Sequence, residues 1–298
     1  MMGEQLQAND PAGQPEQPEQ PELWAIRRIL VALDASANSR AALETAVNLA
    51  ALLRSEVHGL FVEDINLVRL TELPFVREIL FAAPALRQLE SEELQRKLRA
   101  RAAVLRHELQ ELTGEHKVPG YFRVIRGAVE QELLTAATEM EADLLAVGRL
   151  GHSIGRRGRL GSTARAVVMR AAPAVLLVRT DVGSGPIVTL YDGSATGRRA
   201  LSLAARLAGP SGDLRVLVWG ADEEEAFERR QFAVRLMETL GTHAQFQHLS
   251  GDLPIRVLQW VNRQKGNLLI LGGGDCLLPD DIQFLLLDEA EQHILLIR

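Results

Sequence analysis

The chain contains 298 residues, which is enough for about two domains of ordinary size. Hydrophobic residues make up 47% of it and aromatic residues only 4%, so the composition indicates a soluble globular protein with an aliphatic core. The net charge of −6 excludes a global basic field for nucleic acid, and the single cysteine, Cys276, excludes an intramolecular disulfide framework. The sequence shows no apolar run that could span a bilayer and no signal-peptide pattern, and we expect a cytoplasmic protein.

Residues 1–23 are rich in Gln, Glu and Pro and include the run PEQPEQPE. Such a segment has too little apolar surface to offset the entropy of ordering it, so it predicts a disordered tail. An acidic docking peptide is the functional alternative. Order is expected to begin at Trp24.

Short apolar runs alternate with segments of helical periodicity from residue 24 to residue 180. The expected strands are Arg28–Leu33, Val57–Val62, Tyr121–Ile125, Asp143–Val147 and Ala174–Val178. The expected helices are Arg40–Leu53, Leu86–Leu112, Val129–Met140 and Thr163–Arg170, with Gly114 and Pro119 ending the longest. Because the strands are apolar throughout, they indicate a parallel sheet that is covered by helices on both faces.

The same series of elements then begins again, after a Gly-rich linker at 181–186. Asp34-Ala-Ser-Ala aligns with Asp192-Gly-Ser-Ala at an offset of 158 residues, and AVLLVR at 174–179 is echoed by HILLIR at 293–298. Matched landmarks in the same order indicate an internal duplication. We therefore expect one domain at 24–180 and a second, shorter one at 186–298, which lacks a counterpart of the insertion at 63–86.

The segment Gly148–Thr163 follows an expected strand and leads into an expected helix. Its glycines allow a close approach of the backbone to an anion, and N–H groups at the start of the helix would point toward that anion. No acidic residue occurs between Asp143 and Asp181, whereas seven arginines do. This bias favours a polyphosphate ligand. The alternative is a flexible, solvated Gly/Arg connection in which Ser162 only caps the helix.

Glycines and a hydroxyl in this loop follow the spacing G-x2-G-x9-G-S/T, at Gly148, Gly151, Gly161 and Ser162. The spacing resembles the ATP-binding signature of the universal stress protein family, and the resemblance covers most of the chain as two tandem copies. It implies an α/β fold with two open, parallel, five-stranded, doubly wound, Rossmann-like sheets of strand order 3-2-1-4-5. In such a sheet, the carboxyl ends of strands one and four form the ligand crevice.

The resemblance also implies a set of contacts to ATP, with Mg²⁺ as an optional companion. Asp34 would contact the adenine or ribose, although it could equally cap the turn before the first helix. The backbone of Phe61 would meet the adenine edge, and Val147 would line the base. Arg149 lies within the motif. The residues expected to hold the phosphates are Gly148, Gly151, Gly161, Ser162 and Thr163. For His152 we expect a solvent-facing or phosphate-contacting side chain, and no metal or catalytic residue is expected in the chain.

The second copy departs from the signature. Gly272 matches Gly148, but Asp275 lies where Gly151 would be, and a carboxylate there would repel phosphate. The following segment, Cys276–Ala290, has no Gly-Ser and contains four acidic residues. We therefore expect that the second copy does not bind ATP and instead acts as a pseudo-dimer partner of the first.

Three functions remain open from the sequence. The favoured one is an ATP-binding regulatory protein that responds to stress through an unknown protein partner. A slow ATP-hydrolysing enzyme is the second, although no Walker lysine or nucleophile–base pair supports it. The third is a scaffold that binds a hydrophobic ligand through the insertion at 63–86. The strand His293–Ile297 could also form a sheet edge that pairs between chains in a homodimer.

Overall fold

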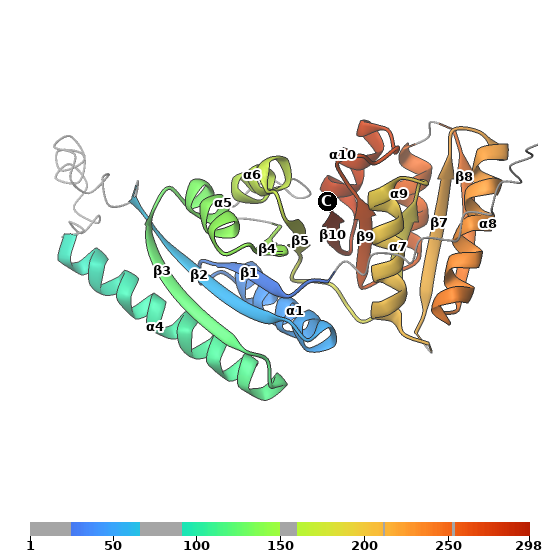
Figure 1. Ribbon diagram of the computed structural model, residues 1–298. Helices are drawn as coiled ribbons and strands as arrows, with labels where there is room; N and C mark the ends of the chain where they lie inside the picture. The colour runs from blue at the N-terminus through green and yellow to red at the C-terminus, as the bar shows by residue number, and fades with distance from the viewer. Residues whose placement is uncertain (1–24, 66–90, 150–159, 211, 252–253) are drawn as a thin grey trace, which may run out of the picture.

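The computed structural model describes residues 25–65, 91–149, 160–210, 212–251 and 254–298 (Figure 1). The predicted tail, most of the insertion at 63–86, and the loop residues Gly151 and His152 lie outside these ranges. The strands of the first repeat are β1 (Arg28–Leu33), β2 (Glu56–Asp64), β3 (Gly120–Gly127), β4 (Leu144–Gly148) and β5 (Ala174–Val178). Its helices are α1 (Ala37–Leu53), α4 (Ser91–His116), α5 (Val129–Glu139) and α6 (Ser162–Arg170).

The second repeat has the same alternation of strands and helices. Its strands are β6 (Ile187–Tyr191), β7 (Leu214–Gly220), β8 (Ala244–Ser250), β9 (Leu268–Gly272) and β10 (His293–Ile297). Its helices are α7 (Ala195–Ala208), α8 (Glu223–Leu240), α9 (Pro254–Arg263) and α10 (Asp280–Glu289).

Within the described residues, all the strands join into one ten-stranded sheet of order β3-β2-β1-β4-β5-β10-β9-β6-β7-β8. Each repeat contributes five parallel strands in the order 3-2-1-4-5, which confirms the predicted fold class. In Figure 1 the two repeats lie side by side, with α4 at one end of the molecule and α8 at the other. The two halves meet where β5 and β10 run side by side.

The junction between the repeats is antiparallel, with Leu176 opposite Leu295 at its centre. Both strands are buried along their whole length, so each needs a neighbour that satisfies its backbone and covers its side chains. The expectation that His293–Ile297 pairs between chains is therefore wrong for this structure, because β5 of the same chain occupies that edge. A homodimer through another surface stays a prediction.

Each face of the sheet carries a core that continues from one repeat into the other. One face is packed by α1, α4, α7 and α8, as Leu43, Leu105, Leu201 and Met237 illustrate. The opposite face is packed by α5, α6, α9 and α10. The alternation of small and branched aliphatic side chains allows these helices to lie close to the strands, as the low aromatic content predicts.

The longest helix departs from its predicted end. α4 continues through Gly114 to His116, and the chain reverses at Lys117, which has a φ of 55°. One glycine inside a helix costs only about 0.5–1 kcal/mol, which is too little to stop a helix whose buried face continues to pack. The other predicted helices and strands of the first repeat lie within three residues of their observed bounds.

Two arginines that the sequence placed in the echoed strand ends cross the junction. Arg179, after β5, donates to the backbone oxygen of Ala290 at 3.3 Å, just past the end of α10. Arg298, after β10, donates to the backbone oxygen of Val168 near the end of α6. Each cation thus lies at the negative end of a helix dipole in the other repeat, where it is stabilising. The sequence signal for these contacts was the arginine that ends both AVLLVR and HILLIR. Helical and strand periodicity alone did not predict them.

His293 begins β10 and is buried at the same junction. Its Nδ1 accepts a hydrogen bond from the backbone N–H of Arg179 at 3.3 Å, so Nδ1 carries no proton. Burial, with added repulsion from the Arg179 guanidinium, lowers the pKa of His293 to about 4.

Acid should therefore destabilise the protein through His293. The unfolded chain takes up this proton near the ordinary pKa of about 6.5, whereas the folded chain resists it until about pH 4. The stabilisation is present above pH 6.5 and is lost as the pH falls toward 4. Between pH 7.5 and 5.0 we expect wild-type protein to lose about 2 kcal/mol more unfolding free energy than His293→Gln, as measured by urea denaturation. His243→Gln, at an exposed histidine, is the control. Equal losses in wild type and His293→Gln would contradict this role.

Candidate functional site

The predicted crevice lies where β1 and β4 end beside each other, with Val31 opposite Ala146 in the parallel register. Gly148 ends β4 against the first turn of α1. A Cβ atom there would lie 2.7 Å from Asn38 Cβ and 3.1 Å from the Asn38 backbone carbon. The glycine is therefore needed for packing in addition to any role toward a ligand.

The amino end of α6 faces the same edge of the sheet. Gly161 is its N-cap residue, and its N–H donates to the backbone oxygen of Arg149 at 3.0 Å. No side chain among the described residues caps this helix, and its first turn contains no acidic residue. Ser162 is exposed and Thr163 is half-buried. The helix start therefore presents backbone N–H groups and hydroxyls where an anion would be stabilised.

Asp34 follows β1 and is exposed at this edge. One of its carboxylate oxygens accepts the backbone N–H of Ser36 at 2.9 Å, and Ser36 in turn caps α1 by accepting the N–H of Ser39. Between them, Ala35 has a φ of 61°, in the left-handed region where the second repeat has Gly193. The structure thus shows the turn-capping role of Asp34, while its contact with a nucleotide stays a prediction.

Phe61 and Val147 are both placed near the crevice, but their side chains point to opposite faces of the sheet. Phe61 is 4% exposed in the core beside α1 and α4, and Val147 is 2% exposed in the core beside α5 and α6. Neither side chain is presented to a ligand in this structure. For Phe61 the predicted contact is through the backbone, and both this contact and that of Val147 with the base stay predictions.

Arg149 departs most from its expected place. It directly follows Gly148 in the glycine-rich signature, but its side chain is only 1% exposed and its guanidinium donates to the backbone oxygen of Ala290 in the second repeat. A guanidinium held there does not face the crevice, so any contact of Arg149 with a nucleotide would have to come from its backbone. The spacing of the motif gave no signal for this contact, because it depends on a helix end 141 residues away.

The equivalent crevice of the second repeat is closed by its own residues. Asp192, the counterpart of Asp34, is 1% exposed and accepts the backbone N–H of Leu277 at 2.6 Å. Asp275 accepts a hydrogen bond from the hydroxyl of Thr196 at 2.5 Å, which lowers the pKa of its carboxyl group. The segment after β9 is therefore fastened onto the start of α7.

Burial, followed by the nearby Asp192 carboxylate, raises the pKa of the Cys276 thiol well above its usual range.

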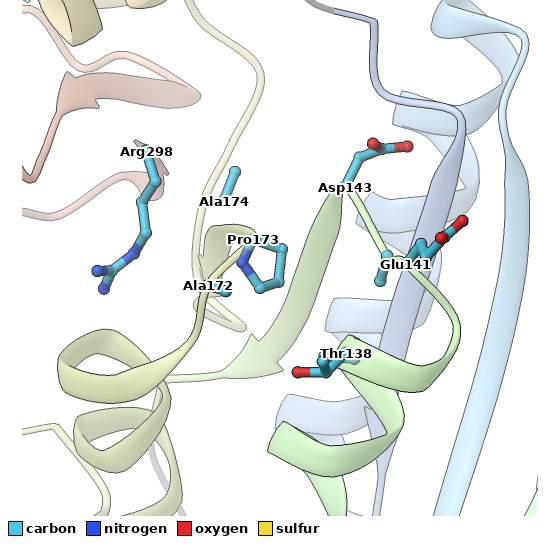
Figure 2. A pocket seen from close by; sticks show the side chains of 9 residues that line it. Thr138, Glu141, Asp143, Ala172, Pro173, Ala174 and Arg298 are labelled. Carbon is cyan, nitrogen blue, oxygen red and sulfur yellow. The ribbon is translucent and has the colours of Figure 1, made fainter.

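A pocket of about 330 Å³ lies at the opposite edge of the sheet, at the amino ends of β4 and β5. Figure 2 shows Arg298 on one side of this pocket and Asp143 and Glu141 on the other. The Asp143 carboxylate accepts the backbone N–H groups of Arg27 and Arg28 and so fastens the start of β1. This pocket is not part of the predicted crevice.

No three His, Cys, Asp or Glu side chains in the described parts of the chain are grouped so that they could hold a metal ion. None of the helices in those ranges combines the length and the apolarity that a bilayer span requires.

The sequence profile of the universal stress protein family matches residues 25–179, which is more than half of the chain. The chain belongs to the universal stress protein family. This assignment confirms the resemblance that the glycine spacing and the duplicated pattern indicated. A comparison with curated proteins finds no match.

Two of the solved structures that the chain resembles share its fold over nearly its whole length. A universal stress protein from Archaeoglobus fulgidus DSM 4304 has a TM-score of 0.68 at 16% identity, covering 91% of this chain and 98% of that one. A putative universal stress protein from Pseudomonas aeruginosa UCBPP-PA14 has a TM-score of 0.62 at 15% identity, covering 92% and 94%. A universal stress protein in complex with cAMP matches 53% of this chain and 99% of its own, at 24% identity and a TM-score of 0.38.

The packing role of Gly148 predicts that Gly148→Ala destabilises the protein even without a ligand. The added methyl group would push against the Asn38 backbone, and overpacking of this kind costs about 1–3 kcal/mol. Urea denaturation measures the loss. Gly114→Ala is the matched control, because its Cβ would meet nothing within 4 Å in a helix and should add about 0.5–1 kcal/mol of stability. A Gly148→Ala protein as stable as wild type would contradict the close approach of α1.

Proposed function

We propose that this universal stress protein binds ATP in its first repeat and acts as a nucleotide-dependent regulatory protein in the cytoplasm. The observation that carries the proposal is the amino end of α6, which has no side-chain cap among the described residues and no acidic residue in its first turn, and which lies at the carboxyl edge of β1 and β4. A helix start of this kind stabilises phosphate by its N–H groups and its dipole. The hydroxyls of Ser162 and Thr163 add donors of the right kind.

The contrast between the repeats supports a single site. At the positions that correspond to Gly161 and Ser162, α10 begins with Asp280 and Asp281. The Asp281 carboxylate accepts the N–H of Ile282 at 2.9 Å, so this helix start is compensated by its own charge. The hydrogen bond from Leu277 to Asp192 closes the equivalent crevice, and together with it these carboxylates disfavour a phosphate in the second repeat.

Binding without sustained turnover fits the chemistry of the crevice. Asp34 supplies a carboxylate at the nucleoside side, but it already accepts the N–H of Ser36, and no nucleophile–base pair accompanies it in the described residues. Mg²⁺ would arrive bound to the triphosphate. ATP would then act as an effector that shifts the protein toward one conformation, by as much as its affinity for the two conformations differs. A partner protein would respond to that conformation.

Ser162→Asp tests the phosphate position. The new carboxylate would face the triphosphate and also compensate the helix dipole, so we expect the Kd for ATP to rise by about tenfold or more. Isothermal titration calorimetry measures the Kd and the stoichiometry, which should be one ATP per chain. The same titration is repeated with cAMP in place of ATP. Asp281→Ser is the matched control in the second repeat and should leave both values unchanged. Two ATP molecules per chain, or no binding by the wild type, would overturn the proposed function. Steady release of phosphate from ATP would show that the protein is an ATP-hydrolysing enzyme instead.

A further inference from the structure

We propose that the second repeat forms part of the nucleotide site of the first, and that Arg149 is the positioning residue that joins them. This inference rests on the proposed function for its consequence in ATP binding, but its structural part can be tested without a nucleotide. The contact concerned is the one between the Arg149 side chain and Ala290, which belong to different repeats.

Arg149 is among the largest fully buried side chains of the described residues. Its Nη1 donates to the Ala290 backbone oxygen, while its Nη2 is buried and finds no hydrogen-bond partner within the described ranges. An arginine is rarely buried unless its charge is compensated, because removing a guanidinium from water costs several kcal/mol. Its burial here therefore calls for a compensating environment in the second repeat.

The carboxyl end of α10 supplies this environment. Ala290 is the C-cap residue, so its carbonyl lies at the negative end of the helix dipole, and the carboxylates of Asp288 and Glu289 add negative charge. Burial, followed by repulsion from Arg179, lowers the pKa of Arg149 to about 10, which still leaves the group charged at neutral pH. Arg149 therefore stays charged at neutral pH, and the carboxyl end of α10 compensates part of the cost of its burial.

The backbone of Arg149 connects this anchor to the helix that would hold the phosphates. Its N–H donates to Val178 in β5 at 2.8 Å, and its carbonyl oxygen accepts the N–H of Gly161, the N-cap residue of α6. The N–H of the adjacent Leu160 also points to an Asp288 oxygen at 3.4 Å. The second repeat therefore contacts the start of α6 twice, through the Arg149 side chain and through Asp288.

The connection is asymmetric. The position in the second repeat that corresponds to Arg149 is Gly273, whose N–H donates to Ile297 just as that of Arg149 donates to Val178. A Cβ on Gly273 would lie 3.0 Å from Leu296 Cδ1, so a side chain there would be crowded. At this position, therefore, only the first repeat has an arginine that contacts its neighbour. We infer that the anchor holds the N-cap of α6 ready for the ligand, which reduces the ordering cost of binding.

Arg149→Met tests the anchor, and Arg298→Met is its matched control. Both variants lose an arginine that donates to a helix end across the junction, but Arg298 contacts the far end of α6, away from its N-cap. We expect Arg149→Met to raise the Kd for ATP about tenfold and Arg298→Met to leave it unchanged. Arg149→Lys should restore much of the affinity, since it keeps the charge and one donor. Asp288→Asn removes charge beside Arg149 and should speed amide exchange at Gly161 by a smaller factor.

Amide hydrogen exchange on the ligand-free proteins gives a readout that does not depend on ATP. Exchange at Gly161 should be faster by about tenfold in Arg149→Met than in wild type, and unchanged in Arg298→Met. Unchanged exchange at Gly161, or a lower stability with an unchanged Kd, would reduce Arg149 to a structural contact and overturn the inference. If wild type binds no ATP but the exchange result holds, the proposed function fails and the anchor stands. Arg149→Lys and Asp288→Asn keep both readouts available if Arg149→Met does not fold.

Discussion

The antiparallel pairing of β5 with β10 is the interaction on which the rest of this structure depends. It joins two five-stranded sheets into one, makes the two cores continuous, and brings the end of each repeat's last helix within reach of an arginine from the other. Without it, two fully buried strands would have bare edges, and Arg149 would have no helix end to contact. The second repeat is therefore a structural neighbour that the first repeat requires, whether or not it binds a ligand itself.

Most of the fold could be predicted from the sequence, because its strands are short apolar runs and its helices have a clear apolar stripe. The bounds of β1 and β5 agree with the prediction, and the duplicated landmarks gave the strand order through the family resemblance. The predictions that depended on distant partners were less successful. Gly114 did not end α4, since packing outweighs one glycine. Arg149 was expected at the nucleotide site because it lies within the motif, but its side chain contacts the carboxyl end of α10, which no local pattern brings close.

The two repeats show how one scaffold can be made open or closed by a few residues. Asp34 and Asp192 lie in equivalent turns of the two repeats. Asp34 is exposed, whereas Asp192 is buried and accepts the backbone N–H of Leu277. The first turn of α6 contains no acidic residue of its own, whereas that of α10 contains two. In physical terms, α10 places its own carboxylates at its amino end, whereas the first turn of α6 offers only N–H groups and hydroxyls. This difference, rather than a change of fold, separates their proposed roles.

The late position of β10 in the chain has a consequence for biosynthesis. A ribosome makes β5 roughly 115 residues before it makes β10, and at ordinary translation rates this gap lasts on the order of 10 seconds. During that time, the first repeat presents an apolar strand edge with no neighbour, which is the kind of surface that chaperones bind and that promotes aggregation. Truncation within the last strand would make this transient exposure permanent, so nonsense changes near residue 293 should be far more harmful to solubility than their small length suggests.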